Sequence, residues 1–149
     1  MNVGAEWIVD AFGCSSASLS DLPTLQSVCE RIITELDLHV VGKPLWQQFP
    51  APGGITGLFL LTESHLACHT YPESGMATFN LYCCKVRPDW RWQERLSEML
   101  DAKRVTVRFV ERGAVEEEEG KERRGEREKG RKGEGEMEKV TASKIQFHP

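Results

Sequence analysis

The stretch that decides the fold is residues 55–84, which read ITGLFLLTESHLACHTYPESGMATFNLYCC. Residues 55–61 form an apolar run of the length of a buried strand, and residues 63–70 alternate weakly between apolar and polar. Residues 72–75, PESG, have the composition of a turn, and residues 76–84 alternate again. Because turns this short join neighbouring strands, the stretch predicts an antiparallel meander.

Further elements are predicted on both sides of this meander. Residues 6–12, EWIVDAF, are rich in β-branched and aromatic side chains, and Gly13 ends the run. We expect further strands at residues 38–46 and at residues 104–110, and a loop at the PAPGG sequence of residues 50–54. The alternation of residues 76–84 predicts one shared face for Met76, Thr78, Asn80, Tyr82 and Cys84.

Two helices are predicted from apolar side chains at helical spacing. The first follows candidate N-caps in residues 18–21 and Pro23, and its stripe is Leu25, Val28, Cys29, Ile32 and Leu36. The second stripe is Trp92, Leu96, Met99 and Leu100.

The element order predicts an α+β fold in which an antiparallel sheet carries both helices on one face. A single layer of this kind leaves the other sheet face uncovered. Pairing with a second copy would cover it. We therefore expect a homodimer, with the two sheets stacked into an αββα sandwich.

Charge and composition divide the chain into two parts. Its 149 residues carry a formal net charge of −4, which argues against a general nucleic-acid binder. Residues 116–139 are almost wholly Glu, Lys, Arg and Gly, so they cannot bury enough apolar surface to fold. We expect a folded domain over residues 1–115 and a charged, disordered tail over residues 116–149. No apolar run approaches the ~20 residues needed to span a bilayer.

The cysteines indicate a reducing compartment. There are five of them, without a CxxC pair or a signal peptide: Cys14, Cys29, Cys68, Cys83 and Cys84. An odd number in this arrangement favours neither a disulfide framework nor a zinc site. We therefore expect a cytoplasmic protein that binds no metal.

Residues 62–70, TESHLACHT, place a carboxylate, a serine, two histidines and a thiol between two apolar runs. Buried polar groups without partners cost several kcal/mol, so a functional site is expected here. Together with GITG at residues 54–57, HTYPE at residues 69–73 and Cys84, this ESHL sequence resembles the central motifs of the prokaryotic S-adenosylmethionine decarboxylase proenzyme family. The resemblance is strong over residues 49–84 and extends over residues 1–115 by element order.

The resemblance implies a self-processing enzyme. The bond between Glu63 and Ser64 would break without a protease, giving a β chain of residues 1–63 and an α chain that starts at Ser64. The Ser64 hydroxyl would attack the Glu63 carbonyl, and backbone strain and oxyanion donors would assist that step. Ser64 would become a covalent pyruvoyl group, whose ketone forms a Schiff base with the substrate amine and replaces a bound cofactor.

The resemblance also assigns roles to other residues. Cys84 would be the proton donor of the decarboxylation, and His69 would accept a proton during processing with support from Thr56. The substrate-binding residues would be Tyr71, Glu73 and Phe49. Cys83 neighbours Cys84 and faces the opposite way in a strand, so we interpret Cys83 and Cys68 as core residues. We interpret His65 as a structural histidine.

The chain departs from the family pattern near the expected substrate pocket. It has Gly4-Ala5-Glu6 where Gly-Arg-His is common, Met76 where Tyr is often found, Asn80 where Asp is often found, and Lys85 where Gly often follows the cysteine. The function that the resemblance favours is decarboxylation of S-adenosylmethionine for spermidine synthesis.

Two alternatives remain open. One is a pyruvoyl-dependent arginine or ornithine decarboxylase, in which Glu6 would bind the substrate's cation if it points inward. The other is an inactive relative that regulates an active partner.

Overall fold

The computed structural model describes residues 3–114. Six strands form one antiparallel sheet in the order β2-β3-β4-β5-β1-β6. Their bounds are β1 Gly4–Phe12, β2 Leu45–Gln48, β3 Ile55–Leu61, β4 Ser64–Tyr71, β5 Met76–Cys83 and β6 Arg104–Arg112. The helices are α1 Ser16–Leu19, α2 Leu22–Glu35 and α3 Trp92–Leu100, with a 3-10 turn, η1, at Pro72–Ser74.

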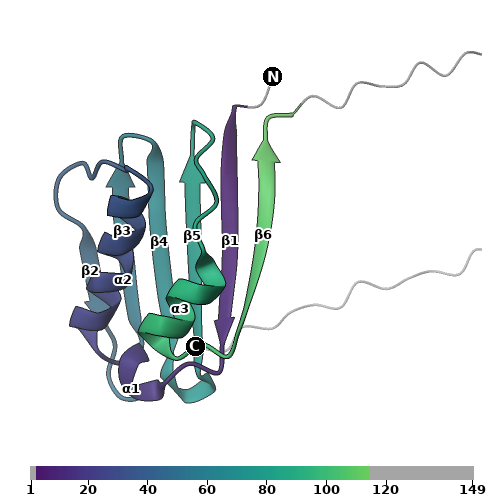
Figure 1. Cartoon of the computed structure of the whole chain (residues 1–149). Helices are drawn as coiled ribbons and strands as arrows, with labels where there is room; N and C mark the ends of the chain where they lie inside the picture. The colour runs from purple at the N-terminus through teal and green to yellow at the C-terminus, as the bar shows by residue number, and fades with distance from the viewer. Residues whose placement is uncertain (1–2, 115–149) are drawn as a thin grey trace, which may run out of the picture. The chain divides into compact units, whose positions relative to one another are not determined.

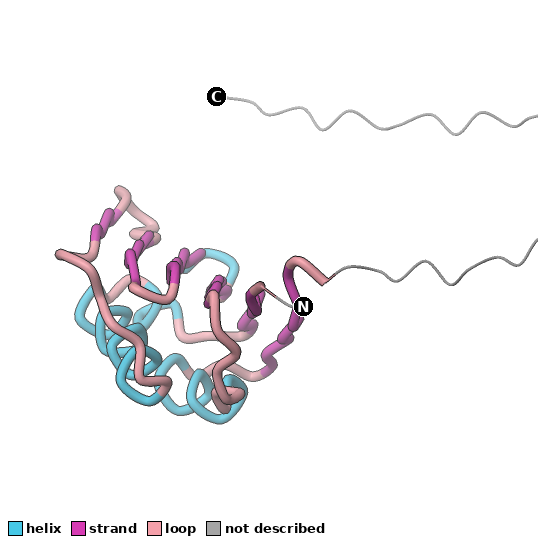
Figure 2. Tube along the Cα trace, turned by 90° about the horizontal axis from the view of Figure 1, so that it is seen from above, coloured by secondary structure: helices cyan, strands magenta, loops and turns pink. Residues whose placement is uncertain are grey.

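All helices lie on one face of the sheet (Figures 1 and 2). The α+β architecture with an antiparallel sheet is therefore confirmed. Side chains alternate along the strands as expected: in β1, Trp7 and Val9 are buried beneath the helices, whereas Glu6 and Ile8 are only partly covered. We call the sheet face opposite the helices the open face.

Helix α2 forms where the apolar stripe predicts it. The Asp21 carboxylate caps its start by accepting a 3.0 Å hydrogen bond from the Thr24 backbone N–H, and Pro23 lies in the first turn. The buried side chains of the helix are those of the predicted stripe: Leu25, Val28, Cys29 and Ile32.

The predicted strand at residues 38–46 is wrong. Only Val40 forms a single bridge, to Leu61, and the strand in this region is β2 at Leu45–Gln48. The apolar run is interrupted by Gly42, which has a φ of 73°, and by Pro44, which has no N–H to donate. A short helix that the sequence reasoning missed, α1, begins after Ser15, whose hydroxyl accepts from the Ser18 N–H.

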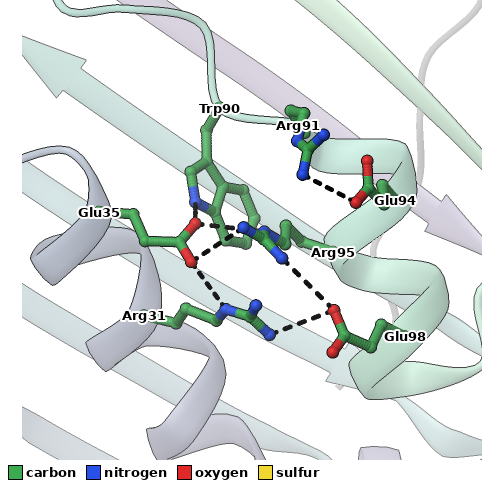
Figure 3. Close-up of polar contacts among 7 residues, drawn as sticks. All are labelled: Arg31, Glu35, Trp90, Arg91, Glu94, Arg95 and Glu98. Carbon is green, nitrogen blue, oxygen red and sulfur yellow. Dashed lines mark hydrogen bonds and ion pairs between the residues drawn. The ribbon is translucent and has the colours of Figure 1, made fainter.

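Charged side chains connect α2 to the segment around α3 (Figure 3). The Glu35 carboxylate accepts a 2.7 Å hydrogen bond from the Trp90 indole and a 3.2 Å bond from Arg95. Arg31 binds Glu35 at 2.9 Å and Glu98 at 3.2 Å. These contacts join a helix that precedes the expected cleavage point to one that follows it.

The sheet interleaves the same two parts of the chain. Strand β1 lies between β5 and β6 (Figure 1), although the expected cleavage point falls between β3 and β4. A break after Glu63 would therefore leave both fragments in one sheet. The predicted tail, residues 116–149, lies outside the described residues.

Candidate functional site

The peptide unit between Glu63 and Ser64 lies in the tight connection between β3 and β4. Strand β3 ends at Leu61 and β4 begins at Ser64. Ser64 has a φ of 144°, a value that non-glycine residues rarely adopt. Backbone strain of this kind costs on the order of 1–3 kcal/mol and collects at functional sites. Strain at this peptide would assist the cleavage that the family resemblance implies, and the φ of Ser64 is of that kind.

The carbonyl oxygen of Glu63 accepts a 2.7 Å hydrogen bond from the backbone N–H of Cys84. Cys84 is the first residue after β5, and β5 pairs with β4 so that Ser64 lies opposite Cys83. An N–H fixed in this position can stabilise negative charge that develops on the carbonyl oxygen during attack at its carbon.

The Glu63 side chain is buried, with 6% of its surface exposed. Its carboxylate contacts the His39 ring at 2.8 Å and Arg87 at 3.2 Å, and it accepts a 3.1 Å bond from the His39 backbone N–H. Burial alone would raise the pKa of Glu63, but the His39 side-chain and backbone hydrogen bonds outweigh it and lower the pKa to about 2. The hydrogen bond to Glu63 in turn raises the pKa of His39.

His39 and Arg87 were missed by the sequence reasoning. Neither lies within a motif, and the distances in sequence to Glu63 are 24 residues in both cases. The sequence points to such partners only indirectly, because a carboxylate between apolar runs needs cationic partners if it is buried. The sequence does not say which cations these are.

The Ser64 hydroxyl lies 3.0 Å from Nδ1 of His65, an exposed residue of the open face. The other ring nitrogen of His65 lies 3.3 Å from the side-chain oxygen of Asn80. His65 is therefore in contact with the expected nucleophile, which the interpretation as a purely structural residue did not anticipate.

A second group of expected site residues lies at the far end of β4. Thr56 and His69 are paired across β3 and β4, with 2.6 Å between the Thr56 hydroxyl and His69 Nδ1. The His69 ring contacts the rings of Tyr71 and Phe49, with centroid distances of 4.5 and 5.9 Å. Glu73 follows in η1 and is exposed.

The structure does not bring these two groups together within one chain. Ser64 and His69 are five positions apart along the same strand, which corresponds to about 16 Å. A shallow groove of about 280 Å³ on the open face runs beside His69 and reaches Asn80, the partner of His65. We call the Glu63, Ser64 and Cys84 group the cleavage end and the Thr56, His69, Tyr71 and Phe49 group the aromatic end.

The two neighbouring cysteines have different environments. Cys83 is fully buried, and burial raises the pKa of its thiol to about 11. Cys84 is exposed. Strand β5 ends one residue earlier than predicted, so Cys84 follows the strand instead of closing it. Cys68 is buried too, in agreement with its interpretation as a core residue.

Two of the positions that depart from the family pattern touch each other on the open face. The Asn80 side-chain amide donates a 2.7 Å hydrogen bond to the Glu6 carboxylate, whose other oxygen binds Arg112. The carboxylate of Glu6 is thus already paired with a guanidinium group of the same chain.

Residues 3–114 show neither a metal-binding cluster nor a membrane-spanning helix. They contain no group of three or more His, Cys, Asp or Glu residues arranged to hold a metal ion. Among these residues, no helix combines the length and hydrophobicity that crossing a membrane requires.

Comparison with known proteins gives consistent matches. The family model for S-adenosylmethionine decarboxylase matches residues 5–113. The S-adenosylmethionine decarboxylase proenzyme of Acetivibrio thermocellus is 33% identical over 77% of this chain and 92% of its own length. The proenzyme of Pelotomaculum thermopropionicum is 32% identical over 78% of this chain and 91% of its own length. The crystal structure of the adenosylmethionine decarboxylase of Aquifex aeolicus superposes with a TM-score of 0.63 at 28% identity, covering 80% of this chain and 98% of that one.

Proposed function

Because this chain belongs to the S-adenosylmethionine decarboxylase family, we propose that it cuts itself between Glu63 and Ser64 and then decarboxylates S-adenosylmethionine. The product would serve as the aminopropyl donor for spermidine synthesis. The observation that carries the proposal is the Glu63–Ser64 junction. There a strained serine follows a carbonyl whose oxygen is held by the Cys84 N–H at 2.7 Å.

The first step converts an amide into an ester. The Ser64 Oγ attacks the Glu63 carbonyl carbon, and the Cys84 N–H stabilises the oxyanion. Breaking the carbon–nitrogen bond then leaves Glu63 esterified to the Ser64 oxygen and frees the Ser64 amine. The positive φ of Ser64 raises the energy of the starting state and thereby favours this step.

The second step removes the α-proton of Ser64 and expels the Glu63 carboxylate, which leaves dehydroalanine at position 64. Its imine tautomer then takes up water and loses ammonia to give the pyruvoyl group. A neutral imidazole can take the α-proton, and His69 is the proposed acceptor, with its ring held by the Thr56 hydroxyl at 2.6 Å. Since His69 lies about 16 Å along the same strand from Ser64, we propose that His69 comes from a second copy of the chain.

The open face supports pairing of this kind. It exposes Leu45, Leu58 and Leu60, whose exposed fractions are 69%, 49% and 62%, on neighbouring strands β2 and β3. Apolar side chains gathered in this way mark interaction surfaces. Two open faces packed in antiparallel orientation would place the aromatic end of one chain against the cleavage end of the other, giving an αββα sandwich.

The pyruvoyl group, once formed at Ser64, supplies a ketone that accepts electrons as carbon dioxide leaves the substrate. The residues around Ser64 fit this group. Cys84 is exposed and adjoins the junction through its N–H, so its thiol is suited to return a proton to the substrate carbon. The buried Cys83 thiol is not accessible to a substrate.

The aromatic end suits a nucleoside. Phe49 and Tyr71 are both partly exposed, and both rings contact the His69 ring. Either ring can stack on an adenine, which is worth about 1–3 kcal/mol per base. Glu73 is the proposed carboxylate for the polar part of the substrate. In contrast, Glu6 is paired with Arg112, so the residue that would favour an arginine or ornithine substrate is not free.

Intact-mass spectrometry and a substrate panel test the proposal. Purified protein should contain two fragments, residues 1–63 and residues 64–149, and the larger should react with a carbonyl-specific hydrazide. It should release carbon dioxide from S-adenosylmethionine and not from arginine or ornithine. A chain that remains whole would support the inactive regulatory relative, and release from arginine or ornithine alone would reverse the choice of substrate.

A further inference from the structure

We propose that His65 is a catalytic base in the first step of self-cleavage, and that Glu6 and Asn80 are positioning residues that fix its tautomer. The inference rests on the proposed self-cleavage and adds a residue to it. The Ser64 hydroxyl oxygen lies 3.0 Å from His65 Nδ1. That distance is within reach for direct proton transfer.

A chain of hydrogen bonds runs from His65 through Asn80 to Glu6. The ionised Glu6 carboxylate fixes which group donates in each bond. Ionised carboxylates only accept hydrogen bonds. Glu6 accepts from Arg112 through one oxygen and from the Asn80 NH₂ group at 2.7 Å through the other. The hydrogen bond from Asn80, followed by the one from Arg112, lowers the pKa of Glu6, so this carboxylate stays ionised near neutral pH.

The orientation of the Asn80 amide determines the tautomer of His65. With its NH₂ group turned to Glu6, Asn80 presents its oxygen to His65 Nε2 at 3.3 Å. That nitrogen must then carry the ring proton of a neutral imidazole. Nδ1 is left with a free lone pair facing the Ser64 hydroxyl, which is the protonation state that a base at this position requires.

The groups come from four elements of the sheet, so the arrangement is built by the fold. Glu6 lies on β1, His65 on β4, Asn80 on β5 and Arg112 on β6. The His65 ring also lies beside the ring of Tyr82, its cross-strand partner, with 5.7 Å between centroids.

The proton and electron movements balance without a further reactant. The hydroxyl proton of Ser64 passes to His65 Nδ1 while the oxygen forms a bond to the Glu63 carbonyl carbon. The carbonyl electron pair moves to the oxygen held by Cys84. When that pair returns, the carbon–nitrogen bond breaks and the His65 proton moves to the Ser64 nitrogen. The step yields an ester and an amine, and His65 is neutral again.

We assign the two histidines to different steps. His65 contacts the Ser64 hydroxyl, which reacts first, whereas the His69 of a second copy is the proposed acceptor of the Ser64 α-proton in the later step. Loss of His65 should therefore block ester formation. Loss of His69 should instead leave the ester formed but not eliminated.

The test uses full-length precursor made by cell-free translation, followed over time by intact mass and by hydroxylamine, which cleaves esters and not amides. We expect His65→Ala to slow self-cleavage at least about 100-fold, with no hydroxylamine-sensitive species. His69→Ala should accumulate a species that hydroxylamine cuts at Glu63. Added imidazole should partly restore cleavage of His65→Ala.

A carboxylate swap tests the positioning role separately. Glu6→Gln removes the group that fixes the Asn80 amide, so cleavage should slow several-fold. Adding Asn80→Asp to that variant restores an obligate acceptor facing His65 Nε2 and should recover most of the rate. Asp10→Asn is the matched control: it breaks a neighbouring ion pair on the same strand, to Arg108 at 3.2 Å, and should cleave normally.

Different results would contradict the role of His65, the positioning role of Glu6 and Asn80, and the proposed self-cleavage. Cleavage of a folded His65→Ala precursor at the wild-type rate would overturn this inference and leave the proposed function standing. Failure of the carboxylate swap to recover the rate lost in Glu6→Gln would overturn the positioning role. A wild-type precursor that never cleaves would overturn the proposed function itself. Thermal melts of each precursor show whether the variants are folded.

Discussion

The backbone N–H of Cys84 donates a 2.7 Å hydrogen bond to the carbonyl oxygen of Glu63. This bond places the residue proposed as proton donor for the substrate directly against the peptide bond proposed to break. Residue 84 therefore contributes two chemically separate groups, a backbone donor for self-cleavage and a thiol for decarboxylation. Substitutions can separate them.

Cys84→Ala should cleave at close to the wild-type rate, because alanine keeps the N–H. Decarboxylation should fall about 10²–10⁴-fold, the usual contribution of a positioned acid. Mass spectrometry of the fragments and carbon dioxide release measure the two effects. Cys83→Ala is the control; it removes a buried thiol and should reduce stability more than turnover. An equal loss of turnover in both variants would contradict the assignment of Cys84.

Cys84→Pro removes the donor itself. Since losing one donor to a developing oxyanion typically costs 10²–10³-fold in rate, the precursor should persist for much longer than that of Cys84→Ala. Time-resolved intact mass gives the rate. A thermal melt of the uncleaved precursor shows whether the loop has kept its fold. Rapid cleavage of folded Cys84→Pro would mean that the hydrogen bond to Glu63 has no part in the step.

The charge of Glu63 should make stability depend on pH. Burial raises its pKa, but the His39 hydrogen bonds outweigh burial and lower the pKa from 4.5 to about 2 in the folded state. A lowered folded-state pKa means that the stabilisation is present above pH 4.5 and disappears as the pH falls toward 2. In the uncleaved Ser64→Ala background, Glu63→Gln should lower the free energy of unfolding by about 1–3 kcal/mol at neutral pH.

Urea unfolding at a series of pH values measures the difference in unfolding free energy between the Ser64→Ala protein and its Glu63→Gln variant. This difference should shrink steadily below pH 4.5. The contribution of His39 to stability depends on pH in the opposite direction. The pKa of His39 is raised by the hydrogen bond to Glu63, so its contribution is complete below pH 6.5 and fades as the pH rises through the raised value. A Glu63→Gln difference that stayed constant from pH 7 to pH 3 would contradict the ion pairing at this site.

The sequence predicted those elements whose pattern is local. The stripe from Leu25 to Ile32 matches the buried face of α2, and the alternation of residues 76–84 matches the open face of β5 as far as Tyr82. The error at residues 38–46 has a local cause as well, because two short apolar runs on either side of Gly42 and Pro44 resemble one strand.

The motif gave the residues of the proposed site but not the residues that surround them. Glu6 and Asn80 are 74 residues apart and meet only because β1 pairs with β5, a long-range pairing that no local pattern specifies. The same holds for His39 and Arg87 around Glu63. Ser64 and His69 are close together in the motif but lie near opposite ends of β4, as an extended strand over residues 63–70 requires.

If His69 acts from a second copy, two inactive variants should complement each other. In a mixed dimer of Ser64→Ala and His69→Ala chains, the Ser64 of one chain faces the His69 of the other, so the His69→Ala chain should be cut although it fails alone. Chains with different tags, co-expressed and separated by mass, show which one is cleaved. A partner chain that carries both substitutions cannot supply His69, so the His69→Ala chain paired with it should stay uncut. If the His69→Ala chain stays whole in purified mixed dimers, the histidine must act within its own chain, and the 16 Å separation along β4 (about five residues of strand) would have to close by another route.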